Sequence, residues 1–145
     1  MIEIRQISAT ETLPVRQPVL RAGRPVTDCY FDGDELPKTV HYGIFKENSL
    51  VGVATFLENK KDTLSGKQMQ LRGMAVLDIY QGKGFGKLLL KKGEALARER
   101  KMDVLWFNAR INAAFFYEKQ GYVTNGAPFE IPQIGTHYVM FKTLR

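Results

Sequence analysis

The sequence is poor in the residues that build metal sites and covalent cross-links. It has one cysteine, Cys29, so we expect neither an intrachain disulfide nor a cysteine-based zinc site. The two histidines, His41 and His137, lie far apart and lack the HExxH spacing of zinc enzymes. We therefore expect no metal ion in this protein.

Long apolar runs are also missing. No segment approaches the roughly 20 apolar residues that a membrane-spanning helix needs. The N-terminal MIEIRQIS carries an acid and an arginine among its isoleucines, so it does not resemble the apolar stretch of a signal peptide. We expect a cytoplasmic protein with no membrane partner.

What is present is an ordinary globular composition. The chain has 145 residues, 44% of them hydrophobic and 25% charged, which fits one domain over residues 1–145. The net charge of +6 is compatible with a nucleic acid, a membrane surface or an anionic small molecule. The positive residues are scattered, and the densest group is Lys83, Lys87, Lys91 and Lys92. An anion is therefore most plausible beside Lys83 and Lys87.

The hydrophobic periodicity predicts mixed α and β structure. A helix over Gly84–Lys101 should bury Phe85, Leu88, Leu89 and Leu96 on one face. Other helical segments are expected over Thr10–Leu20, in short pieces because of Pro14 and Pro18, and over Asn112–Gln120, ended by Gly121. Strands are expected over Ile2–Ile7, Gln68–Val76, Asp103–Ala109, Tyr122–Val123 and Thr136–Leu144, with a hairpin over His41–Glu58 that turns at Glu47–Ser49. Long connections should cover Arg21–Lys38 and Asn59–Lys67.

Three alternating glycines, Gly82, Gly84 and Gly86, stand between a predicted strand and a predicted helix. A helix begins with unpaired N–H groups that favour an anion, and glycine lets the backbone approach it closely. The loop therefore predicts a phosphate site. It is not a Walker loop, because Gln81 stands where the first glycine should be and Leu88 where serine or threonine should be. The dinucleotide pattern GxGxxG fails as well.

The hexapeptide QGKGFG, from Gln81 to Gly86, resembles the pyrophosphate loop of the GNAT superfamily of N-acetyltransferases. LRGMAV, over Leu71–Val76, is similar to the family's fourth strand, and AAFFYEKQGY, over Ala113–Tyr122, to its tyrosine-bearing helix. The resemblance is specific over residues 40–145. It implies an α/β (mixed α+β) fold with a mostly antiparallel twisted sheet of about six to seven strands, splayed between strands four and five and flanked by helices. Residues 1–40 would form the acceptor side and 41–145 the acetyl-CoA-binding core.

The resemblance implies acetyl-CoA as donor and an amine as acceptor. Backbone groups of the loop would hold the pyrophosphate, helped by lysine charge, and those of the fourth strand would pair with the pantetheine arm. A backbone N–H near Val76 would stabilise the oxyanion. The asparagine that contacts the cofactor in many members is replaced here by Arg110, so Asn108 or Asn112 could take over its contact. The implied cofactor residues are Met74, Ala75, Val76, Gln81, Gly82, Lys83, Gly84, Phe85, Gly86, Lys87, Asn108, Asn112 and Tyr117.

Tyr117 matches the family tyrosine that protonates the departing thiolate, so it is the implied general acid. The glutamate that serves some members as general base is replaced by Gln70, which cannot accept a proton at neutral pH. His137, Glu58 and His41 remain candidates, and we rank His137 first because it begins the last strand and histidine is the side chain best suited to proton transfer at neutral pH.

Arginines of the early region point to the chemistry of the acceptor. Arg16, Arg21 and Arg24 lie where the family shapes its acceptor site, and Arg72 could reach it from the strand before the loop. Guanidinium groups suit carboxylates and phosphates. We therefore expect Arg21, Arg24 and Arg72 to bind an acid group on the amine, with a solvated basic loop as the alternative.

Two other function classes stay open at this stage. The first is a non-catalytic acyl-CoA sensor that uses the same loop, which the replacement of the catalytic glutamate by Gln70 permits. The second is a basic nucleic-acid-binding module. It is disfavoured because Trp106 and the Phe115–Phe116 pair are better explained as core and channel wall than as a stacking platform. The oligomeric state stays open, a homodimer included.

Overall fold

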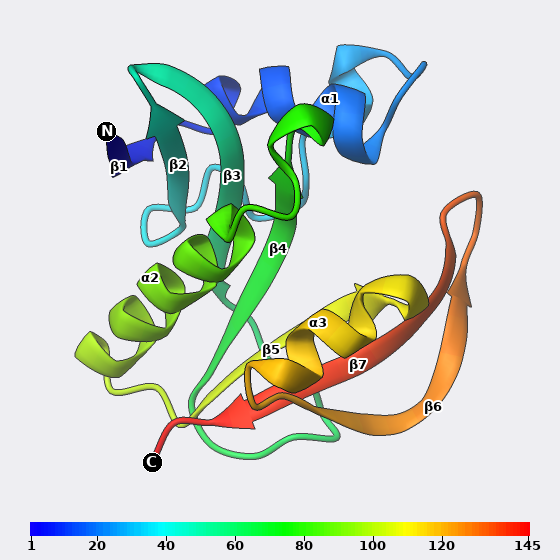
Figure 1. Cartoon of the computed structure of the whole chain (residues 1–145). Helices are drawn as coiled ribbons and strands as arrows, with labels where there is room; N and C mark the ends of the chain where they lie inside the picture. Colours follow the sequence, from blue (N-terminus) through cyan, green and yellow to red (C-terminus); the bar gives the residue numbers. More distant parts are fainter. The chain divides into compact units, whose positions relative to one another are not determined.

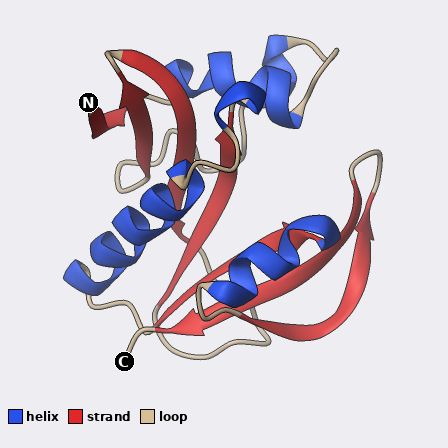
Figure 2. Cartoon of the chain, viewed as in Figure 1, coloured by secondary structure: helices blue, strands red, loops and turns tan.

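The computed structural model describes all 145 residues and contains one seven-stranded sheet with helices beside it (Figure 2). The strand order is β1-β2-β3-β4-β5-β7-β6. The pairs β1–β2, β2–β3, β5–β7 and β6–β7 are antiparallel, and β4 pairs with β5 in parallel. The predicted mixed fold with six to seven mostly antiparallel strands is therefore confirmed.

The chain divides into two compact units. Unit 1 comprises Met1–Glu58 and Leu71–Gly93, and unit 2 comprises Asn59–Gln70 and Glu94–Arg145. Two elements, β4 (Gln68–Val76) and α2 (Phe85–Glu99), have residues in both units. The predicted boundary at residue 40, between the acceptor side and the acetyl-CoA-binding core, stays a prediction.

Unit 1 begins with β1 (Ile2–Ile7), which pairs with the hairpin of β2 (Val40–Lys46) and β3 (Ser49–Glu58) (Figure 1). Glu47 and Asn48 both have positive φ, 48° and 66°, as the two central residues of a tight hairpin turn require. The strands and the hairpin turn predicted here are confirmed. Ile7 of β1 and Val53 of β3 form a core cluster with Val15 and with Ala75 of β4.

Between β1 and β2 the chain forms only short helices. A 3₁₀ turn at Thr10–Thr12 leads into α1 (Leu13–Leu20), which has Pro14 in its first turn and Pro18 inside it. Proline lacks the N–H that a longer helix needs, so the predicted limit to short pieces is confirmed. The long connection that follows contains a 3₁₀ turn at Val26–Cys29.

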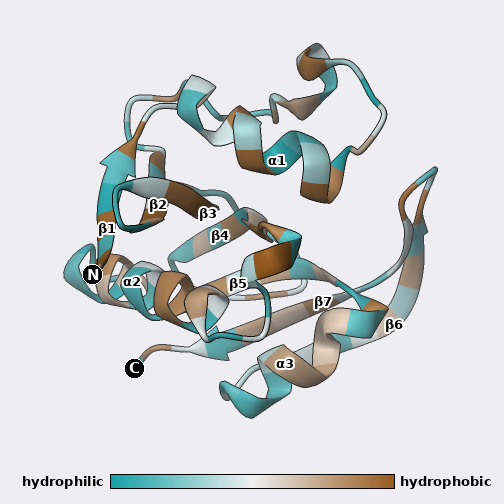
Figure 3. Ribbon diagram, turned by 45° about the horizontal axis from the view of Figure 1, so that its top comes forward, coloured by the Kyte–Doolittle hydropathy of each residue, from teal (hydrophilic) through white to brown (hydrophobic).

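Helix α2 carries an apolar face, and Figure 3 shows brown, apolar segments alternating with teal, polar ones along its ribbon. The buried residues are Phe85, Leu89, Leu90, Gly93, Glu94 and Ala97. Leu88 is 45% exposed, so its predicted place on the buried face is wrong. The apolar face follows the i, i+4 series from Phe85 through Leu89, which turns Leu88 towards solvent.

Unit 2 is built on β5 (Val104–Arg110), β7 (Gly135–Thr143) and β6 (Val123–Ile131). The short helix α3 (Ala114–Lys119) lies along β5 and β7 (Figure 1), and Gly121 ends it with a φ of +96°. Val104, Trp106 and Val139 form the core of one face, with Leu64, Phe129 and Phe141 packed against it. The predicted short helix and its terminal glycine are confirmed.

Strand β6 is much longer than the predicted Tyr122–Val123. The extra residues include Asn125, Gly126 and Pro128, which are residue types that favour turns. In the structure these residues fall where the pairing with β7 shifts register, between Asn125 and Phe129. An irregularity of this kind tolerates glycine and proline inside a strand.

Within unit 2, β4 pairs with β5 through Gln68, Met69 and Gln70 only. The remaining six residues of β4, Leu71–Val76, belong to unit 1. The predicted splaying of strands four and five stays a prediction. No helix of the structure is long and apolar enough to cross a membrane.

Candidate functional site

The glycine loop, Gln81–Gly86, lies between β4 and α2 and ends in the first turn of α2, all within unit 1. A 3₁₀ turn at Asp78–Tyr80 precedes it. The Gln81 side chain closes the loop, because its Nε2 donates to the Val76 carbonyl at 2.9 Å and to Asp78 Oδ1 at 3.2 Å. Gly82 and Gly84 have φ of +77° and +87°, and a Cβ on either would meet nothing within 4 Å. The loop therefore needs glycine for its backbone shape rather than for packing.

The backbone of this loop offers a row of free donors. Gln81 N–H donates to the Asp78 carbonyl at 3.2 Å, and Leu88 N–H donates to the Gly84 carbonyl at 3.1 Å. The N–H groups between them, from Gly82 to Lys87, donate to no acceptor in the protein. Lys83 and Lys87 are exposed and have no ion-pair partner. Such an arrangement of amides, helix dipole and lysine charge suits an anion with several oxygens.

Strand β4 carries Met74, Ala75 and Val76 immediately before the loop. Ala75 is buried, while Met74 and Val76 are half-buried. Within unit 2, the pairing of β4 with β5 covers Gln68, Met69 and Gln70. Backbone groups on an unpaired strand edge can accept an extended ligand as an additional strand.

Tyr117 lies on α3 in unit 2, 8% exposed, in a group of aromatic rings. Its ring centroid is 4.2 Å from that of Phe107, 5.0 Å from that of Phe116 and 6.2 Å from that of Tyr122. Its hydroxyl forms no hydrogen bond within the protein. Burial raises the pKa of this hydroxyl above its ordinary value of 10. Tyr117 therefore stays protonated at neutral pH and can act as a proton donor, not as a base.

A buried network that sequence reasoning missed lies beside it. The Tyr122 hydroxyl donates to Glu94 Oε2 at 2.7 Å, and Lys142 Nζ donates to the same oxygen at 3.2 Å. Burial and the Glu94 carboxylate raise the pKa of Tyr122. No local sequence signal could have joined residues from α2, from the connection between α3 and β6, and from β7. The network fixes the Tyr122 ring, which in turn bounds the space around Tyr117.

The three candidate bases differ in whether they have a lone pair available to accept a proton. His137 is 4% exposed, and its Nδ1 lies 2.8 Å from the Gly135 carbonyl, so Nδ1 carries the proton and Nε2 keeps its lone pair. Both ring nitrogens of His41 are occupied, Nδ1 by Thr55 Oγ1 at 2.7 Å and Nε2 by the Asp34 carbonyl at 2.9 Å. Glu58 is exposed at the end of β3. Of the two histidines, only His137 has a nitrogen available to accept a proton.

Gln70 lies in β4 and is buried. Its Oε1 accepts a hydrogen bond of 2.8 Å from Asn59 Nδ2. On β5 and the turn after it, Asn108 and Asn112 are exposed and their side chains form no hydrogen bond. Arg110, between them, is half-buried. Either asparagine is therefore free to contact a ligand.

The early arginines have distinct environments. Arg16 is fully buried and forms an ion pair with Asp34, whereas the Arg24 Nε donates to Asp28 Oδ2 at 3.1 Å. Arg21 and Arg72 are half-buried, and both guanidinium groups lie over the ring of Phe31. The structure thus brings Arg16, Arg21 and Arg72 together and leaves Arg24 with Asp28.

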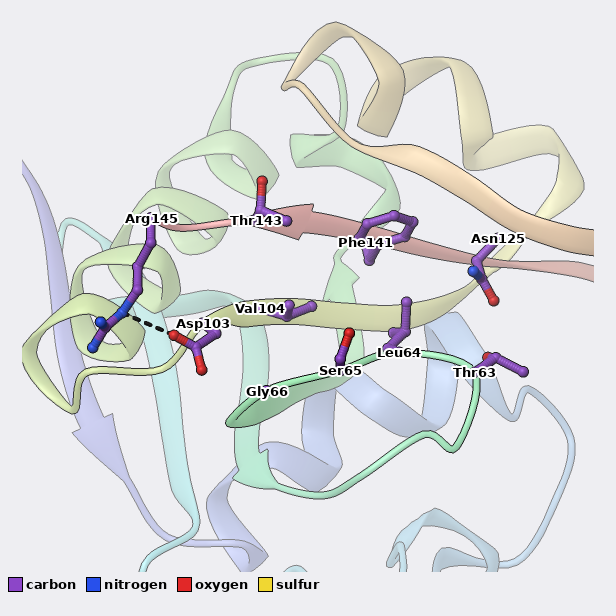
Figure 4. Close-up of a pocket in the computed structure, with 10 residues that line it drawn as sticks. All are labelled: Thr63, Leu64, Ser65, Gly66, Asp103, Val104, Asn125, Phe141, Thr143 and Arg145. Carbon is purple, nitrogen blue, oxygen red and sulfur yellow. Dashed lines mark ion pairs between the residues drawn. The ribbon is translucent and has the colours of Figure 1, made fainter.

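Unit 2 also contains an open hollow of about 450 Å³, drawn in Figure 4. Its walls are the 59–67 connection, the ends of β5 and β7, and Asn125 of β6. The ion pair of Arg145 with Asp103 closes one end. None of the residues predicted to act in catalysis or binding lines this hollow.

Comparison with known proteins places the chain in a family. The model of the acetyltransferase (GNAT) family matches residues 4–122. The uncharacterized N-acetyltransferase YitI of Bacillus subtilis is 34% identical over 146 residues, which cover 100% of this chain and 98% of YitI.

Solved structures agree with this assignment. The ribosomal-protein-S18-alanine N-acetyltransferase from Escherichia coli has a TM-score of 0.76 at 16% identity, covering 99% of this chain and 94% of that one. An aminoglycoside 6'-N-acetyltransferase complexed with coenzyme A has a TM-score of 0.74 at 13% identity, covering 99% and 97%. The family and the enzyme class predicted from the sequence are thus confirmed. The chain belongs to the GNAT family of acetyltransferases.

Proposed function

We propose that the protein transfers an acetyl group directly from acetyl-CoA to a primary amine of a small molecule or peptide. The observation that carries this proposal is the row of unpaired backbone N–H groups from Gly82 to Lys87 at the start of α2. A pyrophosphate supplies the oxygens that these donors lack. Family membership and the coenzyme A bound to the aminoglycoside-modifying relative support the choice of ligand.

Each residue has a defined part in the proposed reaction. The amides of the loop hold the pyrophosphate, and Lys83 and Lys87 add charge. Main-chain groups of Met74, Ala75 and Val76 pair with the pantetheine arm, and an N–H near Val76 polarises the thioester carbonyl. Asn108 and Asn112 are further cofactor contacts.

The chemical step moves one acetyl group and two protons. The amine nitrogen forms a bond with the thioester carbon, the carbon–sulfur bond breaks, and the sulfur leaves as a thiolate. Tyr117 donates its phenolic proton to that thiolate. His137 Nε2 accepts the proton that the amine loses, because Nδ1 is committed to the Gly135 carbonyl.

Thermal unfolding tests the ligand first. Acetyl-CoA and coenzyme A should each raise the unfolding midpoint, and NAD should not, because a ligand that binds only the native state stabilises it by mass action. ATP serves as a control for unspecific phosphate binding. No shift with either coenzyme A species would leave the loop without its proposed ligand.

A screen of primary amines for thiol release from acetyl-CoA tests the reaction. Transfer to at least one amine is expected. Binding of acetyl-CoA with no transfer to any amine, in a panel of amino acids, polyamines and peptide N-termini, would favour an acyl-CoA sensor instead.

A further inference from the structure

Three guanidinium groups surround one aromatic ring in unit 1. Phe31 lies in the connection before β2, and the guanidinium carbons of Arg16, Arg21 and Arg72 stand 4.2, 5.2 and 5.9 Å from its ring centroid. The arginines come from α1, from the end of α1 and from β4, so the fold itself assembles the group. We call these four residues the Phe31 cluster.

Arg16 is the most deeply buried member of the cluster. It is fully buried, and its guanidinium donates to both carboxylate oxygens of Asp34, at 2.6 and 3.1 Å, and to Thr55 Oγ1 at 2.8 Å. Asp34 balances its charge. The Nε of Arg16 is the one buried side-chain nitrogen or oxygen in the protein without a hydrogen-bond partner.

Arg72 supplies the charge that is not balanced. It is half-buried, and its Nη1 donates to the backbone carbonyl of Asp32 at 2.7 Å. No carboxylate forms an ion pair with it. A guanidinium has five N–H donors, so most of those on Arg72 remain available to a ligand, in the forked geometry that fits a carboxylate or a phosphate.

Phe31 is held against β4 by a glycine. A Cβ on Gly73 would lie 2.9 Å from the Phe31 ring and 3.2 Å from Arg16 Nε, so only glycine lets the ring pack this closely. The ring partly desolvates the arginines beside it, which strengthens their attraction to an anion.

We propose that the Phe31 cluster binds the carboxylate or phosphate of the acceptor molecule, so that the protein acetylates amines which also carry an acid group. This inference rests on the proposed acetyl transfer. Arg72 stands two residues before Met74, about 7 Å along an extended strand. The acid group would therefore be held a short molecular distance from the strand segment proposed to present the thioester.

Binding of matched probes tests the cluster without any reaction. Calorimetry would compare N-acetylglycine with N-acetylglycinamide, and O-phosphoethanolamine with ethanolamine, in the absence and presence of saturating coenzyme A. Each anionic probe should bind about tenfold more tightly than its neutral partner, as a charge-assisted pair of hydrogen bonds predicts. The stronger of the two preferences identifies carboxylate or phosphate.

Variants connect that preference to the cluster. Arg72→Gln should abolish it, and Arg72→Lys should restore only part of it because lysine lacks the fork. Arg5→Gln is the matched control. Arg5 also lies over an aromatic ring, 3.9 Å from the Phe45 centroid on unit 1, and is paired with Glu3. It should keep the full preference.

The outcomes separate this inference from the proposed function. Equal binding of charged and neutral probes, or a preference that Arg72→Gln leaves intact, would overturn the role of the cluster even if neutral amines are acetylated. If Arg5→Gln lost the preference equally, the preference would come from the general positive charge of the protein and not from the Phe31 cluster. A preference that depends on Arg72, in a protein that binds no coenzyme A, would support the anion site and refute acetyl transfer.

Discussion

At the scale of single residues, Tyr117 is the sharpest test of catalysis. Tyr117→Phe removes the proton donor but keeps the ring among Phe107, Phe116 and Tyr122. General acids contribute about 10²–10⁴-fold, so kcat should fall by at least about 10²-fold. Acetyl-CoA should still raise the thermal midpoint, because the variant keeps the glycine loop and the aromatic ring and loses only the hydroxyl. Tyr30→Phe, at an exposed tyrosine, is the control for loss of a hydroxyl. A Tyr117→Phe enzyme with full kcat would remove the residue from the mechanism.

The raised pKa of Tyr117 makes a separate prediction about pH. A general acid works only while protonated, so activity is present below its pKa and lost above it. Because burial raises this pKa above 10, the pH–rate profile should show no descending limb near pH 10. Single-turnover rates between pH 7 and pH 10 would measure it. A descending limb near pH 10 that disappears in Tyr117→Phe would mean that the hydroxyl titrates normally.

The Phe31 cluster predicts an unusual sensitivity at Gly73. Gly73→Ala places a methyl group 2.9 Å from the Phe31 ring on a backbone with φ of +62°. Gly23→Ala imposes a similar φ, +78°, with nothing within 4 Å. The left-handed conformation costs about 1–2 kcal/mol in both, and overpacking adds about 1–3 kcal/mol at Gly73 only. Urea unfolding of both variants measures the difference; equal losses would mean that Phe31 moves aside freely.

Candidate site residues could be predicted from the sequence more readily than the tertiary contacts around them. QGKGFG and Tyr117 could be proposed as site residues because each belongs to a local sequence pattern. Arg16 could not be distinguished from Arg21, since only the tertiary fold shows that Asp34 and Thr55 surround it. Phe31 had no recognisable signal in the sequence, because its importance depends on arginines from α1 and its C-terminal end and from β4, which are far apart in the sequence.

At the scale of elements, helix α2 packs closely against β3 because residue 93, at the contact, is a glycine and has no side chain. A Cβ on Gly93 would lie 2.0 Å from the Phe56 ring. Alanine is favoured over glycine in a helix by about 1 kcal/mol, but the clash should outweigh this gain, and Gly93→Ala should destabilise the protein. A Phe56→Leu background should relieve part of the loss, measured as a double-mutant cycle in urea. Additive effects would show that the helix shifts instead.

The glycine loop is the second element with a distinct prediction. Gly84→Ala meets no protein atom within 4 Å, so its methyl group would enter the space offered to the ligand. We expect affinity for coenzyme A to fall by about tenfold or more, the equivalent of one lost charge-assisted hydrogen bond. Gly126→Ala, with a φ of +83° and equally open space, is the control and should leave affinity unchanged. Unchanged affinity in Gly84→Ala would place the pyrophosphate elsewhere.

Elements with a clear period or cap were predictable, and irregular ones were not. The bounds of β1 and β4 match the sequence expectation, and Gly121 ends α3 as predicted. Strand β6 was mostly missed, because Asn125-Gly126 and Pro128 favour a turn when read locally. Pairing with β7 on both sides of the register shift overrides that local preference.

At the scale of the whole molecule, the boundary between the two units runs through the middle of two elements. Gln68–Gln70 of β4 lie in unit 2 and Leu71–Val76 in unit 1, and α2 changes unit after Gly93. A helix or strand cut at such a point loses the backbone hydrogen bonds that cross the cut. Because β4 and α2 are each complete only when both units are folded, we expect the chain to unfold in one cooperative transition.

The sequence supplies one natural probe for each unit. Trp106, the only tryptophan, is buried in unit 2, and Cys29, the only cysteine, is a free thiol with 0% exposure in unit 1. Tryptophan fluorescence and thiol labelling, followed against urea on the same protein, should give coincident midpoints. If Cys29 becomes reactive at clearly lower urea than the fluorescence change, unit 1 opens first and the shared elements do not couple the two. Coincident midpoints would mean that a destabilising substitution in either unit, such as Gly73→Ala or one near Tyr117, lowers the stability of the entire enzyme. The loss of activity in any variant must then be judged against the unfolding midpoint of that variant.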